Sequence, residues 1–269
     1  MKKLNSLSIV VLITYLAMIT VNALANALPI NGMITGDISD SYPNLFAPTG
    51  ITFTIWGVIY LLLAAYTAYQ LGLFRKQGEE VKTALLKDVG TLFAISSLAN
   101  VAWIFAWHYK NILLSTVFML IILVCLALIT IRINKEKLTA NEKFFIRLPF
   151  SVYFGWITVA TIANVTTLLV DKLGSPVNLL GISEVVWTVI ILLVGLLIGV
   201  ITVLKNRDVP YGLVIVWAYI GILIKHLMNK PLPDGFNSQY PAVIATVVFS
   251  LVVLVATLVF TQLKAKNSK

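Results

Sequence analysis

The sequence predicts an all-α integral membrane protein with about eight transmembrane helices. Hydrophobic residues make up 59% of the 269 residues and charged residues 12%, whereas soluble domains are about a quarter charged. The mean hydropathy is +0.94. Apolar stretches of about 18 or more residues recur along the whole chain, and a helix of that length crosses roughly 30 Å of hydrocarbon. This composition excludes a soluble enzyme with a membrane anchor.

Eight helices account for the apolar stretches. Their expected ranges are 5–27, 47–74, 88–108, 111–133, 143–170, 182–204, 210–229 and 241–263. Polar or charged segments separate them. One of these segments contains Thr139–Glu142 (TANE), which has the spacing of a helix-start capping box and predicts the start of the fifth helix.

The charge distribution predicts the orientation of the helices. Most of the 20 Lys and Arg residues fall at the N-terminus, the C-terminus and in every second connecting segment. The alternate segments hold only Lys110, Lys172, Lys225 and Lys230. By the positive-inside rule, both termini are cytoplasmic in a cell membrane. We therefore attribute the net charge of +9 to topology and lipid attraction, and we do not expect nucleic acid as a partner.

The N-terminal segment is open to two interpretations. The segment resembles a secretory signal with a small-residue cleavage site, because it contains Lys2-Lys3, an apolar run and then Ala23–Ala25. Cleavage would leave seven helices. Asn22 and Asn26 share one helical face, and amides within a bilayer need partners on neighbouring helices. This favours a retained first helix that packs against the others.

The sequence shows no catalytic or metal-binding constellation. The single Cys125 excludes a disulfide framework, a Cys-based zinc site and a covalent haem attachment. The two histidines, His108 and His226, are too far apart for a paired-His metal motif, and we expect His108 to be a solvated residue at the outer rim. We therefore do not favour an enzymatic function.

Aromatic and amide residues form stripes on three predicted helices. Trp56 and Tyr60 share a face of the second helix, and Asn100, Trp103 and Trp107 share a face of the third. On the fifth, Trp156, Ala160 and Asn164 are spaced by fours. If the stripes converge, they enclose an aromatic cavity for a flat, largely apolar ligand. Interfacial anchoring of Trp and helix–helix packing by Asn are the alternatives.

Three segments carry these residues in a recognisable order. They are Pro48–Tyr60, Leu98–Trp107 and Pro149–Asn164, and the last keeps a W-x3-A-x3-N spacing. Together they resemble signatures of the second, third and fifth helices of the TspO/MBR family, the tryptophan-rich sensory proteins that include the mitochondrial translocator protein. The resemblance covers residues 1–170 and implies a five-helix bundle there. Residues 171–269 are then three further transmembrane helices of unknown role.

The resemblance also implies a site and a ligand class. The positions that match the lining of the family's cavity are Trp56, Asn100, Trp107, Trp156 and Ala160. Signature or packing positions are Pro48, Tyr60, Trp103 and Asn164. Family ligands include tetrapyrroles such as haem and protoporphyrin, bound without a covalent link. The outer loop 29–46 is either a lid over this cavity or a plain connector.

These features lead to one favoured function and one alternative. We expect a binding or sensory membrane protein that receives a flat hydrophobic small molecule. The alternative is a permease for such a molecule. Against it, the charged residues Asp88, Glu184 and Lys225 lie near span ends, where they are expected to snorkel or stay hydrated. Gly195 and Gly199 form a GxxxG motif that suits either a homodimer seam or packing within the chain.

Overall fold

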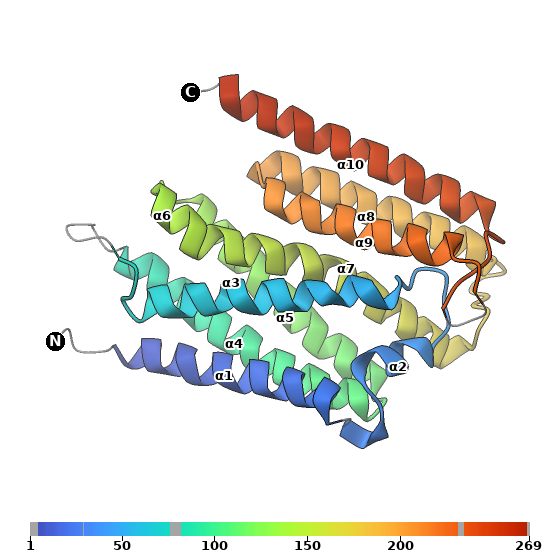
Figure 1. Ribbon diagram of the computed structural model, residues 1–269, viewed down its shortest axis with the longest axis horizontal. Helices are drawn as coiled ribbons and strands as arrows, with labels where there is room; N and C mark the ends of the chain where they lie inside the picture. The colour runs from blue at the N-terminus through green and yellow to red at the C-terminus, as the bar shows by residue number, and fades with distance from the viewer. Residues whose placement is uncertain (1–4, 29, 76–81, 231–233, 268–269) are drawn as a thin grey trace. The chain divides into compact units, whose positions relative to one another are not determined.

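The computed structural model describes residues 5–28, 30–75, 82–230 and 234–267. Within these ranges every regular element is a helix (Figure 1). Eight helices in this described part are long and apolar enough to cross a membrane. The predicted all-α, multi-pass fold class is therefore confirmed.

The helix bounds lie close to the predicted ones. The long helices are α1 Ser6–Ala27, α3 Ile55–Gln70, α4 Thr83–His108, α5 Ile112–Asn134, α7 Leu148–Leu173, α8 Glu184–Asn206, α9 Val209–Leu227 and α10 Pro241–Asn267. The short ones are η1 Ile30–Gly32, α2 Thr35–Asp40, η2 Gly50–Thr54, α6 Ala140–Glu142 and the π-helical turn η3 Lys143–Arg147.

Predicted boundaries of the second and third helices are wrong by several residues. The helix expected at 47–74 is a 3₁₀ turn, η2, followed by the shorter α3, so Pro48 precedes the helix. The helix expected at 88 begins at Thr83, because Leu85 and Leu86 are already buried. Early burial of apolar side chains extends the helix into the charged segment.

The capping box at Thr139 is confirmed. The backbone N–H of Glu142 donates to Thr139 Oγ1 at 3.2 Å, and the N–H of Thr139 donates to Glu142 Oε2 at 2.8 Å. The π turn η3 follows directly, before Pro149. In a regular α-helix the ring of Pro149 would clash with the carbonyl of Phe145, and a wider turn gives that carbonyl more room.

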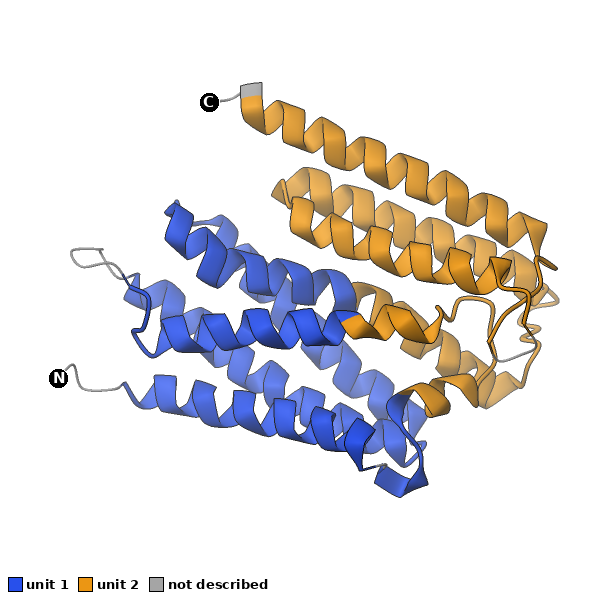
Figure 2. Ribbon diagram, viewed as in Figure 1, with its two compact units in different colours: residues 1–35, 55–157 blue, residues 36–54, 158–269 orange. Residues whose placement is uncertain are grey.

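The chain divides into two compact units (Figure 2). Unit 1 contains residues 1–35 and 55–157. Within it, α4 packs against both α1 and α5, and α1 also contacts α3. Its core includes three interlocking rings: Tyr66 lies 4.7 Å from Phe150 and 5.4 Å from Phe93 between ring centroids.

Unit 2 contains residues 36–54 and 158–269. Within it, α10 packs against α8 and α9. A Cβ added at Gly195 would lie 2.6 Å from the hydroxyl of Tyr219 on α9, and one at Gly199 would lie 3.3 Å from Leu254 on α10. Both glycines of the GxxxG motif therefore serve packing within unit 2. Homodimerisation stays a prediction.

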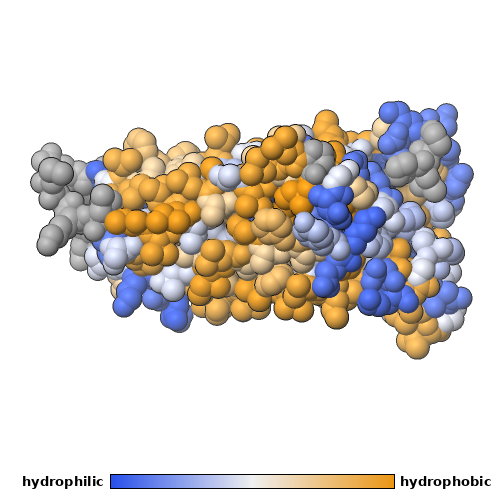
Figure 3. Space-filling model, turned by 90° about the horizontal axis from the view of Figure 1, so that it is seen from below, coloured by the Kyte–Doolittle hydropathy of each residue, from blue (hydrophilic) through white to orange (hydrophobic). Residues whose placement is uncertain are grey.

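The surface fits a membrane environment. On the face shown in Figure 3, hydrophobic side chains cover most of the middle, and hydrophilic ones gather mainly on the right-hand side of the view. Orientation by the positive-inside rule, the fate of the N-terminal segment and the division at residue 170 stay predictions. Lys2, Lys3, Lys76 and Lys269, on which the orientation partly depends, lie outside the described residues.

Candidate functional site: the Trp56 cluster

Six aromatic side chains of unit 1 form a cluster centred on Trp56. The members of this Trp56 cluster are Trp56 and Tyr60 on α3, Trp103 and Trp107 on α4, and Tyr153 and Trp156 on α7. The centroid of the Trp56 ring lies 5.4 Å from that of Tyr60 and 6.5 Å from that of Trp103. It lies 6.0 Å from Tyr153 and from Trp156, which meet it edge-on. The stripes on these three helices thus face one another.

Local helix geometry explains the arrangement. Residues three or four apart lie on the same side of an α-helix, so Tyr60 follows Trp56 and Trp107 follows Trp103. Trp103 and Trp107 accordingly stack with ring centroids 5.9 Å apart. Tyr153 and Trp156 occupy equivalent positions on α7. Each helix therefore contributes two rings to one cluster.

Burial within the cluster is uneven. Trp103, Trp107, Tyr153 and Trp156 are at most 7% exposed, whereas Trp56 is only half-buried. The centroid spacings are those of rings in direct contact. Trp56 and Tyr60 are therefore the two members of the cluster that stay partly exposed.

A chain of polar side chains adjoins the cluster. Asn22 Nδ2 on α1 donates to Asn100 Oδ1 on α4 at 2.6 Å, and Asn100 Nδ2 donates to the Tyr153 hydroxyl at 3.5 Å. Asn22 Nδ2 also donates to the carbonyl of Met18. A buried amide that lacks hydrogen-bond partners is costly in a bilayer, so these bonds fix the position of Asn100 beside the aromatic rings. They also agree with a packed first helix.

The short segment 30–35 is held on the C-terminal end of α4. Trp107 Nε1 donates to the carbonyl of Thr35 at 3.2 Å. His108 Nδ1 lies 3.0 Å from the carbonyl of Ile30, and its Nε2 lies 3.1 Å from Thr35 Oγ1. The carbonyl requires the proton on Nδ1, so Nε2 accepts from the threonine hydroxyl when the ring is neutral.

The expectation that His108 is a solvated rim residue is wrong. His108 is fully buried, because both of its ring nitrogens bind the segment that follows α1. Neither nitrogen is left to ligate a metal. This part of the predicted loop 29–46 is a packed cover over the end of α4, apart from Pro29, which lies outside the described residues.

Three predicted residues belong to unit 2. Asn164 is buried and Ala160 half-buried in the second part of α7, and Pro48 is buried ahead of η2. The structure therefore brings Trp56, Trp103, Trp107, Trp156, Tyr60 and Asn100 together within unit 1. A place for Ala160 in the same ligand site stays a prediction.

A protein-family model described as TSPO-like protein matches residues 8–260. The chain belongs to the TSPO-like protein family. The resemblance inferred from three motifs is thus confirmed in part: the chain is TSPO-like, whereas a TspO/MBR five-helix bundle over residues 1–170 stays a prediction. The match reaches all eight candidate spans, including those after residue 170. No curated protein and no solved structure matches the chain.

In this TSPO-like chain, unit 2 contains a second polar cluster that the sequence did not reveal. Residues 40–52, which we call the α9 strap, lie along one side of α9. The polar contacts are Asp40 to Lys225 at 3.3 Å, the Leu45 carbonyl to His226 Nε2 at 2.9 Å, the Thr49 N–H to the Gly221 carbonyl at 3.2 Å, and the Thr52 carbonyl to Trp217 Nε1 at 2.9 Å.

The sequence contained one feature that could have indicated this strap. Trp217, Gly221 and Lys225 are spaced by fours, so they share one helical face. A polar face on a span is costly when it points toward lipid. The contact partners themselves lie more than 160 residues away in sequence, and no local pattern identifies them.

The expectation for Lys225 is also wrong. Its side chain is 6% exposed and forms an ion pair with Asp40, whereas the sequence predicted a snorkelling or hydrated lysine. The strap covers the end of α9, and this coverage removes the ammonium group from solvent.

Proposed function

We propose that this TSPO-like membrane protein binds a flat, largely hydrophobic small molecule at the Trp56 cluster, with a tetrapyrrole such as protoporphyrin as the expected class. One observation supports the proposal most strongly. Rings from α3, α4 and α7 meet around the half-buried Trp56. Aromatic faces stack on a planar ligand, and such contacts are worth about 0.5–1.5 kcal/mol for each pair beyond burial of area.

The polar groups give the ligand an orientation. Asn100 holds its amide beside Tyr153 through bonds to Asn22 and the tyrosine hydroxyl. The Asn100 Nδ2 to Tyr153 bond is long at 3.5 Å, so this N–H group can turn to an acceptor at a ligand edge at little cost. Asn100 would therefore bind a polar edge while the rings cover the faces.

The burial of His108 limits how a porphyrin can be bound at this site. Both of its ring nitrogens already bind segment 30–35. We therefore propose recognition through the macrocycle face, without ligation of a central iron by this histidine. Metal-free protoporphyrin should bind as well as haem does.

The proposal is tested by titrating detergent-purified protein with protoporphyrin and following the absorption of the porphyrin. Trp156→Ala removes an edge-on partner of Trp56 and should weaken binding about tenfold, since a factor of ten corresponds to about 1.4 kcal/mol. Asn100→Ala should weaken it about fivefold through loss of one hydrogen bond.

Trp187→Phe provides the matched control, because Trp187 lies in unit 2 and donates to the carbonyl of Leu179. Its affinity for protoporphyrin should equal that of the wild type. Circular dichroism and gel filtration establish that each variant is folded. Wild-type affinity in both Trp156→Ala and Asn100→Ala would show that the site is assigned wrongly.

A further inference from the structure

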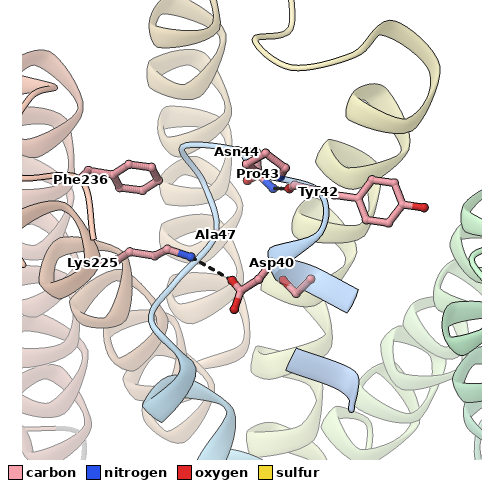
Figure 4. A pocket seen from close by; sticks show the side chains of 8 residues that line it. Asp40, Tyr42, Pro43, Asn44, Ala47, Lys225 and Phe236 are labelled. Carbon is pink, nitrogen blue, oxygen red and sulfur yellow. Dashed lines mark hydrogen bonds and ion pairs between the residues drawn. The ribbon is translucent and has the colours of Figure 1, made fainter. Parts of the chain in front are cut away.

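A small pocket opens in unit 2 between the α9 strap and the end of α9 (Figure 4). The residues that line it are Ser39, Asp40, Tyr42, Pro43, Asn44, Ala47, Lys225 and Phe236. Its enclosed part has room for about one water molecule, so a ligand carboxylate fits there only when the Asp40 carboxylate turns away.

Lys225 supplies the positive charge of this pocket. Its side chain is 6% exposed, and its Nζ lies 5.9 Å from the centroid of the Phe236 ring. An ammonium group has three N–H donors. Among the described residues, the structure gives this one a single hydrogen-bond acceptor, Asp40 Oδ1. A buried cation with spare donors favours a further negatively charged partner.

Asp40 is a poorly placed partner for this lysine. The Nζ to Oδ1 distance is 3.3 Å, whereas strong charge-assisted bonds are about 2.7–2.9 Å. The Asp40 side chain is 41% exposed, so its carboxylate can turn into solvent at low cost. A carboxylate that is free to move could approach Lys225 more closely.

The polar side chains of Asn44 and Tyr42 in this pocket are already engaged. Asn44 Nδ2 donates to the Tyr42 carbonyl, and Asn44 Oδ1 accepts from the N–H of Phe46. The Tyr42 hydroxyl bonds to Asp171, and burial together with that carboxylate raises the pKa of Tyr42. Lys225 therefore remains the group that determines which ligand binds.

We propose that this pocket binds the carboxylate of a small apolar acid, and that Asp40 holds the carboxylate position until the ligand displaces it. The exchange replaces one anion by another, so the buried ammonium stays paired throughout. Pro43, Ala47 and Phe236 provide an apolar surface for the body of the ligand. The bond between Leu45 and His226 is untouched, so the strap stays attached to α9.

The test uses 4-fluorobenzoate as the probe and full-length protein in detergent, with ¹⁹F NMR line broadening as the readout. Asp40→Asn removes the competing carboxylate and keeps the shape of the side chain. It should tighten binding about fivefold, the upper range for an ion pair that is partly exposed. Lys225→Met should weaken binding at least about tenfold, because a hydrogen bond to a charged group is lost.

Three controls separate this site from non-specific uptake and from the Trp56 cluster. Lys205→Met removes an exposed lysine of unit 2, on α8, that does not line the pocket, and should leave binding unchanged. The neutral probe 4-fluorobenzamide should not bind. Trp156→Ala should also leave fluorobenzoate binding unchanged, so the outcome is independent of the Trp56 cluster.

The gain of affinity in Asp40→Asn is decisive, because a folding defect cannot produce it. Unchanged or weaker binding in Asp40→Asn would overturn the exchange of carboxylates. Wild-type binding in Lys225→Met, or equal binding of the benzamide, would overturn the site itself.

Discussion

Replacing Gly221 with alanine should lower the free energy of unfolding by about 2–3 kcal/mol, the upper range for overpacking. A Cβ at this position would lie 2.9 Å from both Cβ and Cγ2 of Thr52, and closer still to Oγ1. The Thr52 Cβ is fixed to the backbone, so η2 itself would have to move. That movement would strain the bonds from Thr49 to the Gly221 carbonyl and from Trp217 to the Thr52 carbonyl.

Unfolding titration in detergent micelles measures this effect. Gly57→Ala is the matched control, because Gly57 also lies within a helix and a Cβ there meets nothing within 4 Å. It should be neutral or slightly stabilising. Adding Thr52→Ala to Gly221→Ala should recover part of the loss. Equal stability of Gly221→Ala and wild type would show that the strap does not pack closely on α9.

Replacing Phe150 with alanine should cost about 3 kcal/mol, at the lower end of the range for buried aromatic residues. Phe150 is fully buried and contacts Tyr66 and Phe93 with ring centroids 4.7 and 5.5 Å apart. In a membrane, the loss of packing contacts and the resulting cavity matter more than transfer from water, since lipid is as apolar as the core.

Phe105→Ala distinguishes packing from general apolarity in the same unfolding titration. Phe105 lies on α4 in the same unit but is 44% exposed. Its replacement should cost well under half as much as that of Phe150. Similar losses for both variants would contradict the placement of Phe150 in a packed core.

The helices could be predicted because the residues that determine them are close together in the sequence. A run of apolar residues long enough for a bilayer forms a helix, since every backbone group must be satisfied internally. Thr139 and Glu142 mark a helix start through their spacing alone. The shorter second helix and the π turn before Pro149 were missed, because the apolar pattern is the same on both sides of these irregularities.

The candidate site could be predicted in part. The stripes Trp56–Tyr60 and Trp103–Trp107 follow from spacing within one helix, and the family resemblance suggested that they converge. The burial of His108 and Lys225 could not be predicted, because each is covered by a loop from a distant part of the sequence. Whether a charged or titratable residue near a span end is hydrated or buried depends on whether such a loop covers it.

The most direct measurement of ligand position is ¹⁹F NMR of protein labelled with 5-fluorotryptophan. The six tryptophans give separate probes, and Trp187 and Trp217 of unit 2 serve as internal references. Protoporphyrin should shift the resonances of Trp56, Trp103 and Trp156 and leave those of the two references in place. Shifts confined to Trp187 or Trp217, or no shift under saturating ligand, would contradict a binding site at the Trp56 cluster.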